Sequence, residues 1–331
     1  MKRKYRIVAF LLLSALSLFV VGLWVVSDYM LGYSLCPERD AYDVEGILKR
    51  KSDEYPWQRE WLDSLCDHAG LHDINMRSTV SDSMLHAVCL PAVCPTERTA
   101  LLVHGYGCCS LDMLHIAFIY HRLLGMNVLM PDLYGHGLSR GDHVNMGWLD
   151  RLDVLQWSAV ADSLFGGDTR MVLHGISMGG ATVMMASGEC LPPYVCAFVD
   201  DCGYTSVWDE FSGELYERFN LSSSLLMCTT SLLCRHRYGW SFQEADCVSQ
   251  VIRCRLPMLF IHGEKDTFVP TRMVSELFRV KPEPKRIWIA KGSKHARSYA
   301  DHPDEYASRV ASFINEYIPQ EHEGRLLVQG Q

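Results

Sequence analysis

Short apolar runs rich in β-branched residues alternate along the chain with longer segments of helical periodicity. The apolar runs predict strands at residues 85–90, 100–104, 126–131, 171–174, 195–199, 258–262 and 287–290. The clearest intervening helix is predicted at 148–165, and the last one at 304–317. Strands that alternate with helices form parallel sheets. We therefore expect an α/β fold with a mostly parallel central sheet flanked by helices.

One long segment departs from this alternation. Residues 206–255 have a helical pattern and lie between two predicted strands, so we expect a small helical lid. Its apolar residues suit the lining of an acyl pocket, and most of them equally suit ordinary helix packing. They are Phe211, Leu215, Tyr216, Phe219, Leu221, Leu225, Leu226, Met227, Trp240 and Phe242. Three acidic lid residues, Glu210, Glu214 and Glu217, suit either a peptide's amino terminus or a solvated helix face.

The first 27 residues have the pattern of a membrane anchor. Residues 7–26 carry no charge and are just long enough to span a bilayer as a helix. A cleaved signal peptide has a shorter apolar core and a small-residue cleavage site, so an anchor or uncleaved signal is favoured here. Basic residues at positions 2, 3, 4 and 6 precede the span and Asp28 follows it, which places the rest of the chain outside the cytoplasm. A lipoprotein cysteine at Cys36 is not favoured, because the bulky Leu35 precedes it.

Beyond the anchor, the length suits one large domain, since single cores extend to about 250–300 residues before chains divide. We expect a lead-in segment at 28–73, a catalytic-size domain at 74–320 with its lid at about 206–255, and a C-terminal tail at 321–331. The net charge is −8, from 31 basic and 39 acidic residues. Without the four basic residues at the N-terminus, 27 basic residues face 39 acidic ones, and a body with a net charge of −12 is expected to repel nucleic acid.

The chain contains 13 cysteines. Four close pairs are compatible with disulfides in an oxidising compartment: Cys89/Cys94, Cys190/Cys196, Cys228/Cys234 and Cys247/Cys254. The odd count and the adjacent Cys108 and Cys109 suit buried free thiols equally well. No CxxC or Cys/His zinc spacing is present, so neither a metal nor another cofactor is predicted.

The candidate nucleophile is Ser177, in the sequence Gly175-Ile176-Ser177-Met178-Gly179-Gly180. This G-x-S-x-G motif follows a predicted buried strand and precedes an Ala- and Met-rich helix. A serine on such a sharp turn needs neighbours without Cβ atoms, and Gly175 and Gly179 supply them. The helix that begins near Met178 directs backbone N–H groups towards a developing oxyanion, so the Met178 amide is one predicted oxyanion donor.

A serine hydroxyl becomes a good nucleophile when a histidine takes its proton and a carboxylate orients that histidine. In this strand-turn-helix context the chain order is Ser, acid, His. We assign the acid to Asp266 and the base to His295, because both lie in loops that leave strand carboxyl ends. The alternatives are Glu264 in the same loop as Asp266, Asp200 or Asp201 after the preceding strand, and His302 as the base. His302 precedes Pro303 and suits the start of the last helix.

Two upstream turns are predicted to lie beside the same site. His104-Gly105-Tyr106-Gly107 follows a strand, and the backbone N–H of Tyr106 is the predicted second oxyanion donor. His104 is expected to brace this loop, and Asp132, in Pro131-Asp132-Leu133-Tyr134-Gly135-His136-Gly137-Leu138-Ser139, to cap or brace the next one.

The motifs HGYG, DLYGHGLS, GISMGG, HGEKD and KGSKH occur in that order, each at a predicted strand end. In this arrangement the chain resembles the α/β-hydrolase superfamily over about residues 84–317. The stretch 200–208, DDCGYTSVW, is similar to a bacterial branch with an N-terminal membrane segment, close to serine aminopeptidase and monoglyceride-lipase type hydrolases. The resemblance implies Ser177 as nucleophile, Asp266 as acid and His295 as base, with the Tyr106 and Met178 amides as the oxyanion hole.

These features predict a serine hydrolase that acts through an acyl-enzyme on ester substrates, including lipids and thioesters. An aminopeptidase-like enzyme of the same fold is the first alternative. A membrane-tethered binding protein without turnover is the second, because a fold alone does not establish a function. The expected partners are a small-molecule ester, lipid or peptide substrate and, through the N-terminal segment, a membrane; the oligomeric state is not predicted.

Overall fold

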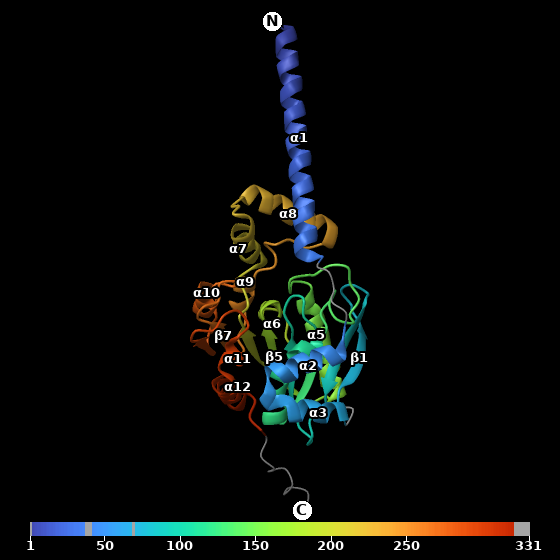
Figure 1. Ribbon diagram of the computed structural model, residues 1–331, viewed down its shortest axis with the longest axis vertical. Helices are drawn as coiled ribbons and strands as arrows, with labels where there is room; N and C mark the ends of the chain where they lie inside the picture. Colours follow the sequence, from blue (N-terminus) through green and yellow to red (C-terminus); the bar gives the residue numbers. More distant parts are fainter. Residues whose placement is uncertain (1, 37–41, 68–69, 321–331) are drawn as a thin grey trace, which may run out of the picture.

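The computed structural model describes residues 2–36, 42–67 and 70–320 (Figure 1). Its centre is an eight-stranded sheet with the order β1-β2-β4-β3-β5-β6-β7-β8, in which β2 alone runs against the others. The strands are β1 His72–Arg77, β2 Met84–Leu90, β3 Arg98–Val103, β4 Asn127–Pro131, β5 Arg170–Ile176, β6 Val195–Asp201, β7 Met258–Gly263 and β8 Lys285–Ala290. The predicted mostly parallel α/β sheet is confirmed, and the predicted tail at 321–331 lies outside the described residues.

Helices cover both faces of the sheet, because each strand buries side chains on alternate sides. In β3, Leu101 and Val103 belong to one hydrophobic core and Ala100 and Leu102 to the other. The first core is covered by α5 Asp150–Leu164, α6 Met178–Ala186, α9 Cys247–Val251 and α10 Arg272–Val280. The second is covered by α2 Val44–Glu54, α3 Arg59–Asp67, α11 Ser298–Asp301, α12 Pro303–Tyr317 and the helical turns η2 Ser110–Met113, α4 Leu114–Ala117 and η3 Phe118–Leu123. A short turn, η1 Pro56–Gln58, precedes α3.

The segment inserted between β6 and β7 is helical, as predicted. Its two main helices are α7 Val207–Phe219 and α8 Ser224–Tyr238. Ser206 and Ser223 cap their N-termini by accepting hydrogen bonds from backbone N–H groups. Gly239 ends α8 in the left-handed conformation, with φ 81°, which glycine adopts without strain. This insertion is called the lid below.

Helix α1 runs without a break over Lys2–Leu35, so the predicted anchor boundary at residue 27 falls inside the helix. By length and composition, Arg3–Leu35 is long and apolar enough to cross a membrane, with a mean hydropathy of 2.6 and none of its most apolar window buried. Its last two turns behave differently. They pack against α8, and Leu31 and Leu35 are fully buried in the first core. Figure 1 shows α1 projecting from the end of the domain where α7 and α8 lie.

The cysteines whose side chains the structure describes are all free thiols, twelve in number. They include both members of each close pair for which a disulfide was compatible with the sequence. Several are fully buried among apolar side chains, such as Cys234, Cys247 and Cys254. The free-thiol interpretation is therefore the one that agrees with the structure.

Candidate active site

Ser177 occupies a sharp turn between the end of β5 and the start of α6. Its backbone has φ 56° and ψ −119°, a strained conformation for a residue with a side chain. The glycines beside it are sterically required. A Cβ atom on Gly175 would lie 2.0 Å from the carbonyl oxygen of Gly179, and one on Gly179 would lie 2.1 Å from the carbonyl oxygen of Val103. The G-x-S-x-G pattern thus presents the serine hydroxyl at the carboxyl edge of the sheet.

The structure brings Ser177, His295 and Asp266 together in one chain of hydrogen bonds. His295 Nε2 lies 2.9 Å from Ser177 Oγ, and His295 Nδ1 lies 2.7 Å from Asp266 Oδ2. The second oxygen of Asp266 accepts hydrogen bonds of 3.0 Å from the backbone N–H groups of Phe268 and Val269. Asp266 is thereby fixed, and it can hold the proton of His295 on Nδ1 so that Nε2 is left to accept the proton of the serine.

A second histidine, His262, lies against the same carboxylate and was given no role by sequence reasoning. Its Nε2 is 3.4 Å from Asp266 Oδ2 and 2.8 Å from the carbonyl oxygen of Val269, to which it donates a hydrogen bond. His262 is fully buried, and burial lowers its pKa. It is therefore a neutral side chain that fixes the acid loop. Its place directly before Gly263 in the HGEKD motif is the signal that could have identified it.

Met178 follows Ser177 directly, and Tyr106 follows Gly105, at which an added Cβ would lie 3.4 Å from the Cβ of Ser177. Met178 is the first residue of α6, where backbone N–H groups have no acceptor within the helix. Tyr106 lies in the loop after β3, and its phenol donates a 3.0 Å hydrogen bond to the carbonyl oxygen of Ser34 in α1. His104 braces this loop. Its ring donates to the carbonyl oxygen of Gly105 at 2.7 Å and accepts the backbone N–H of Leu133 at 3.0 Å, while burial lowers its pKa and keeps it neutral.

Asp132 braces the neighbouring loop, as expected. It is completely buried and accepts backbone N–H groups of Ser110 at 2.6 Å and Leu138 at 3.0 Å. Burial alone would raise the pKa of this carboxyl, but these bonds and a 2.7 Å contact with His86 Nδ1 hold it below its usual value. The charge of Asp132 therefore stabilises these loops.

The four alternative residues have other hydrogen-bond partners in the described chain. Glu264 accepts the Gly292 N–H at 2.8 Å, Asp200 accepts the Gly203 N–H at 3.0 Å, Asp201 accepts the Tyr306 hydroxyl at 2.9 Å, and His302 Nε2 contacts the Lys291 carbonyl oxygen at 2.8 Å. Burial raises the pKa of Asp201 to about 7, so it is partly protonated at neutral pH. The geometry therefore favours Asp266 and His295 over these alternatives.

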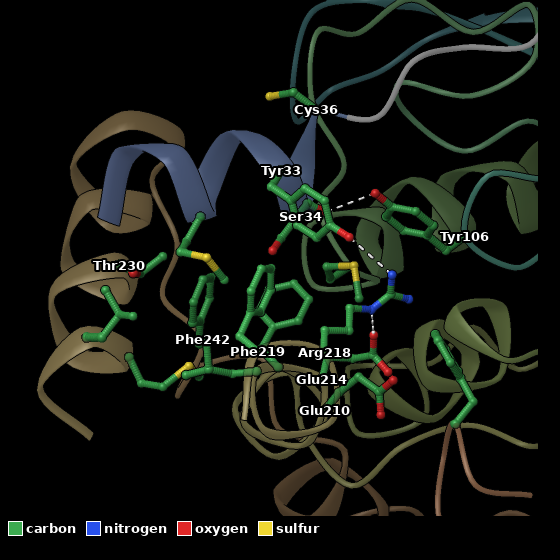
Figure 2. Close-up of a pocket in the computed structure, with 17 residues that line it drawn as sticks. Tyr33, Ser34, Cys36, Tyr106, Glu210, Glu214, Arg218, Phe219, Thr230 and Phe242 are labelled. Atoms are coloured by element: carbon green, nitrogen blue, oxygen red, sulfur yellow. Dashed lines mark hydrogen bonds and ion pairs between the residues drawn. The ribbon is translucent and has the colours of Figure 1, made fainter. Parts of the chain in front are cut away.

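A cavity of about 570 Å³ lies between α1, α7, α8 and the loops that carry Tyr106 and Phe268, and none of Ser177, Asp266 and His295 is among its lining residues. Tyr106 and Phe268 form part of its wall, and the ring centroid of Phe268 lies 4.9 Å from that of His295. Most of its remaining wall is apolar. Of the three acidic lid residues, Glu210 and Glu214 line the cavity, whereas Glu217 is exposed and is not one of its lining residues. Figure 2 shows this cavity with its lining side chains.

Residues 100–309, more than half of the chain, match the sequence model of the alpha/beta hydrolase family. The chain belongs to the alpha/beta hydrolase family. The match extends from β3 into α12 and includes the serine turn, the acid loop and the histidine loop.

Several relatives are similar over most of this region. The uncharacterized protein YqkD of Bacillus subtilis is 24% identical over 220 residues, which are 66% of this chain and 72% of YqkD. The uncharacterized protein YfhR of Escherichia coli K12 is 25% identical over 222 residues, 65% of this chain and 70% of YfhR. Protein bem46 of Schizosaccharomyces pombe is 27% identical over 192 residues, 56% of each chain.

Solved structures share the fold at low sequence identity. The Pyrococcus furiosus esterase Pf2001 superposes with a TM-score of 0.60 at 19% identity, covering 76% of this chain and 95% of the esterase. The acylaminoacyl peptidase of Pyrococcus horikoshii superposes with a TM-score of 0.58 at 14% identity, covering 79% of this chain and 44% of the peptidase. Esterases and peptidases therefore both occur among proteins of this fold.

One group of side chains in the described region has the spacing of a metal site: Cys202, Asp266 and His295, whose ligand atoms lie within 4.8 Å of one another. A thiol binds metal as thiolate. Burial raises the pKa of the Cys202 thiol well above its usual value, and Asp266 and His295 already bind each other. These residues therefore do not fit a metal ion.

Proposed function

We propose that this protein is a serine hydrolase that cleaves esters through a covalent acyl-enzyme. The observation that carries this proposal is the continuous hydrogen-bond chain from Ser177 Oγ through His295 to Asp266. As Ser177 Oγ attacks the carbonyl carbon, His295 Nε2 takes its proton and Asp266 stabilises the resulting imidazolium. The carbonyl oxygen becomes an oxyanion, held by the backbone N–H groups of Tyr106 and Met178.

The second half of the reaction uses the same groups. His295 returns the proton to the leaving alcohol, thiol or amine as the tetrahedral intermediate collapses to the acyl-enzyme. A water molecule then gives a proton to His295 and attacks the acyl carbon. Collapse of this second intermediate releases the acid and returns the proton to Ser177. No step requires a metal or another cofactor.

The cavity lined by Phe268, whose ring packs against His295, favours an ester with a substantial acyl group as substrate. Its lining includes Phe211, Leu215 and Phe242 from the lid. Its volume of about 570 Å³ lies within the usual range of small-molecule pockets, about 300–1,000 Å³. These features favour carboxylesters, lipids and thioesters as substrates. A binding protein without turnover would need no aligned acid, base and nucleophile, so the intact hydrogen-bond chain weighs against that alternative.

Helix α1 supports membrane anchoring of this hydrolase. Its large apolar side chains before Ser27, except the partly buried Leu23, are exposed to the surroundings, and a helix of this length spans about 30 Å of hydrocarbon with residues to spare. The basic residues at its N-terminus favour a cytoplasmic N-terminus. The catalytic domain is then extracytoplasmic.

The test is active-site labelling of the full-length protein in detergent. A fluorophosphonate probe should modify Ser177, identified by mass spectrometry of the labelled peptide, and the Ser177→Ala variant should remain unlabelled. The same wild-type preparation should hydrolyse p-nitrophenyl butyrate. A folded protein that neither reacts with the probe nor cleaves the ester would refute the proposal.

One observation favours an aminopeptidase-like activity as second candidate. Glu210 lines the cavity, is only 4% exposed, and has one carboxyl oxygen, Oε2, without a hydrogen-bond partner among the described residues. A peptide's ammonium group would pair with its ionised form. Burial raises the pKa of Glu210 to about 8, so the neutral form predominates at pH 7. The ester hydrolase is therefore favoured over the aminopeptidase. Turnover of leucine p-nitroanilide in the same assay would reverse this order.

The buried Glu210 also predicts a pH-dependent stability. Its pKa is about 8 in the folded protein and about 4.3 in an unfolded chain. Between these values unfolding releases its proton, so the free energy of unfolding falls as the pH rises. Glu210→Gln cannot ionise, and its stability relative to wild type should therefore rise from pH 5 to pH 8 by on the order of 4 kcal/mol. Thermal unfolding of both proteins at pH 5 and pH 8 checks this; an equal difference at both pH values would contradict it.

A further inference from the structure

Part of the cavity wall comes from helix α1, which the sequence assigns only to anchoring. Met30, Tyr33 and Ser34 line the cavity together with residues of α7 and α8. In Figure 2 the end of α1 closes the cavity on the side opposite α7. A helix that served as a plain tether would not need to complete a pocket next to the catalytic loops.

The end of α1 is fastened to the lid by specific polar contacts. Ser27 Oγ lies 2.7 Å from Thr229 Oγ1, and Asp28 forms an ion pair of 2.5 Å with Arg237. Both partners are on α8. These contacts hold the last turns of α1 in a defined position, so the wall that α1 contributes is a fixed part of the cavity.

Two further contacts join α1 to the other walls. Arg218 of α7 donates a 3.1 Å hydrogen bond to the Tyr33 hydroxyl and also pairs with Glu214. The Tyr106 hydroxyl donates to the Ser34 carbonyl oxygen. Helix α1 is therefore linked both to the lid and to the loop that carries an oxyanion donor.

The cavity lies close to the level at which α1 leaves the apolar segment. Met30 is four residues after Val26, the last residue of the uncharged run, which corresponds to about 6 Å along the helix axis. Tyr29 and Tyr33 are 63% and 48% exposed at this level, where aromatic residues sit at membrane interfaces. The adjoining lid also exposes apolar side chains, namely Tyr216, Phe219, Leu221, Leu225 and Leu232. This end of the domain therefore has the surface of a membrane-contacting face.

The cavity is itself divided into a polar and an apolar side. Figure 2 shows Glu210 and Arg218 on the same side as Tyr106, whereas Phe242 lies on the opposite side, where the hydroxyl of Thr230 is the polar group that the picture labels. A ligand with a polar group near the catalytic loops and a hydrocarbon chain between α1, α7 and α8 matches this division.

We propose that the last turns of α1 form one wall of the acyl-binding site, and that the substrate is a membrane-resident ester whose acyl chain enters this cavity directly from the bilayer. This inference rests on the proposed ester hydrolysis. Moving a chain from the bilayer into water costs about 0.8 kcal/mol per CH₂ group. A cavity whose wall is the membrane helix itself removes that cost, because the chain passes from lipid to apolar protein surface.

The test changes the size of the α1 wall in the full-length protein, reconstituted in phosphatidylcholine nanodiscs. Met30→Trp fills the cavity and Met30→Ala enlarges it. The control is Tyr29→Trp, which introduces the same indole one position earlier in α1, at a residue that does not line the cavity. Each protein is assayed with p-nitrophenyl acetate and p-nitrophenyl palmitate.

Met30→Trp should lower the ratio of kcat/KM for the palmitate to kcat/KM for the acetate at least about tenfold, the effect of losing contact with roughly two CH₂ groups. Met30→Ala should move the optimum of an acyl-length series to longer chains, and Tyr29→Trp should alter neither ester. If the wild type hydrolyses the acetate and neither Met30 variant changes palmitate turnover, the role of α1 in acyl binding is refuted, whereas the proposed ester hydrolysis is not. Absence of turnover of both esters by the wild type would refute the ester hydrolase and this inference with it.

Discussion

Replacement of Ser177 by alanine is expected to lower kcat for ester hydrolysis about 10⁴- to 10⁶-fold and to leave the melting temperature close to that of wild type. In the proposed mechanism the serine oxygen forms the acyl bond, so no neighbouring group can replace it. Its side chain makes the 2.9 Å hydrogen bond to His295 but fills no core position, which is why stability is spared. Rates with p-nitrophenyl butyrate and thermal unfolding in detergent measure both effects.

Substitutions of His295 and Asp266, the other two residues of the hydrogen-bond chain, should give large and non-additive losses of kcat. His295→Ala is expected to cost about as much as Ser177→Ala, and Asp266→Asn about 10⁴-fold, because an amide leaves the histidine in the wrong tautomer. Combining the changes should add little to the largest single loss. The matched controls are His302→Ala and Glu264→Gln, whose side chains bind the backbone of Lys291 and Gly292. The assignment would be contradicted if His302→Ala lowered kcat as much as His295→Ala, or if Glu264→Gln lowered it as much as Asp266→Asn.

Substitution of Gly179 by alanine is expected to destabilise the protein by about 4 kcal/mol or more and to remove activity. The added Cβ would lie 2.1 Å from the carbonyl oxygen of Val103 and 2.6 Å from that of His104. Both oxygens belong to the backbone at the end of β3 and the loop that follows, so relief requires α6 and the oxyanion loop to move apart. The serine turn cannot keep its geometry through that movement.

The control for this substitution is Gly213→Ala in α7. An added Cβ there has nothing within 4 Å, and alanine is favoured over glycine in a helix by about 0.5–1 kcal/mol. Thermal unfolding should therefore show a fall of about 10 °C for Gly179→Ala and a small rise for Gly213→Ala. Equal melting temperatures for the two variants would show that the close packing of Gly179 is not needed.

The central sheet was predictable because its strands are buried on both faces and read as continuous apolar runs. Strand β1 was missed for the opposite reason. Its sequence, His72–Arg77, is mostly polar and exposed, as expected for a strand at the edge of the sheet, so no apolar run marks it. The π-helical turn at Phe118–Leu123 was not predicted either, because it depends on how residues 114–123 pack on the second core.

The candidate triad was predictable because its parts lie in local motifs whose order along the chain is characteristic. The cavity was not, because its walls come from α1, the lid and two loops that are far apart in sequence. Glu210, Glu214 and Glu217 have the spacing of one helix face. Which of them lines the cavity depends on how the lid packs on the rest of the domain, and the sequence of the lid does not contain that information.

The unbroken course of α1 has a consequence for kinetics. The helix is about 51 Å long at 1.5 Å per residue, and its last turns are fixed to the lid, so the span continues into the domain without a hinge. If α1 spans a membrane and the substrate is a lipid ester, as proposed above, an enzyme mounted in this way cannot reach lipids of a neighbouring vesicle. Its rate should follow the surface density of substrate in its own bilayer, and dilution of that substrate with inert lipid should slow turnover even when the total concentration is unchanged.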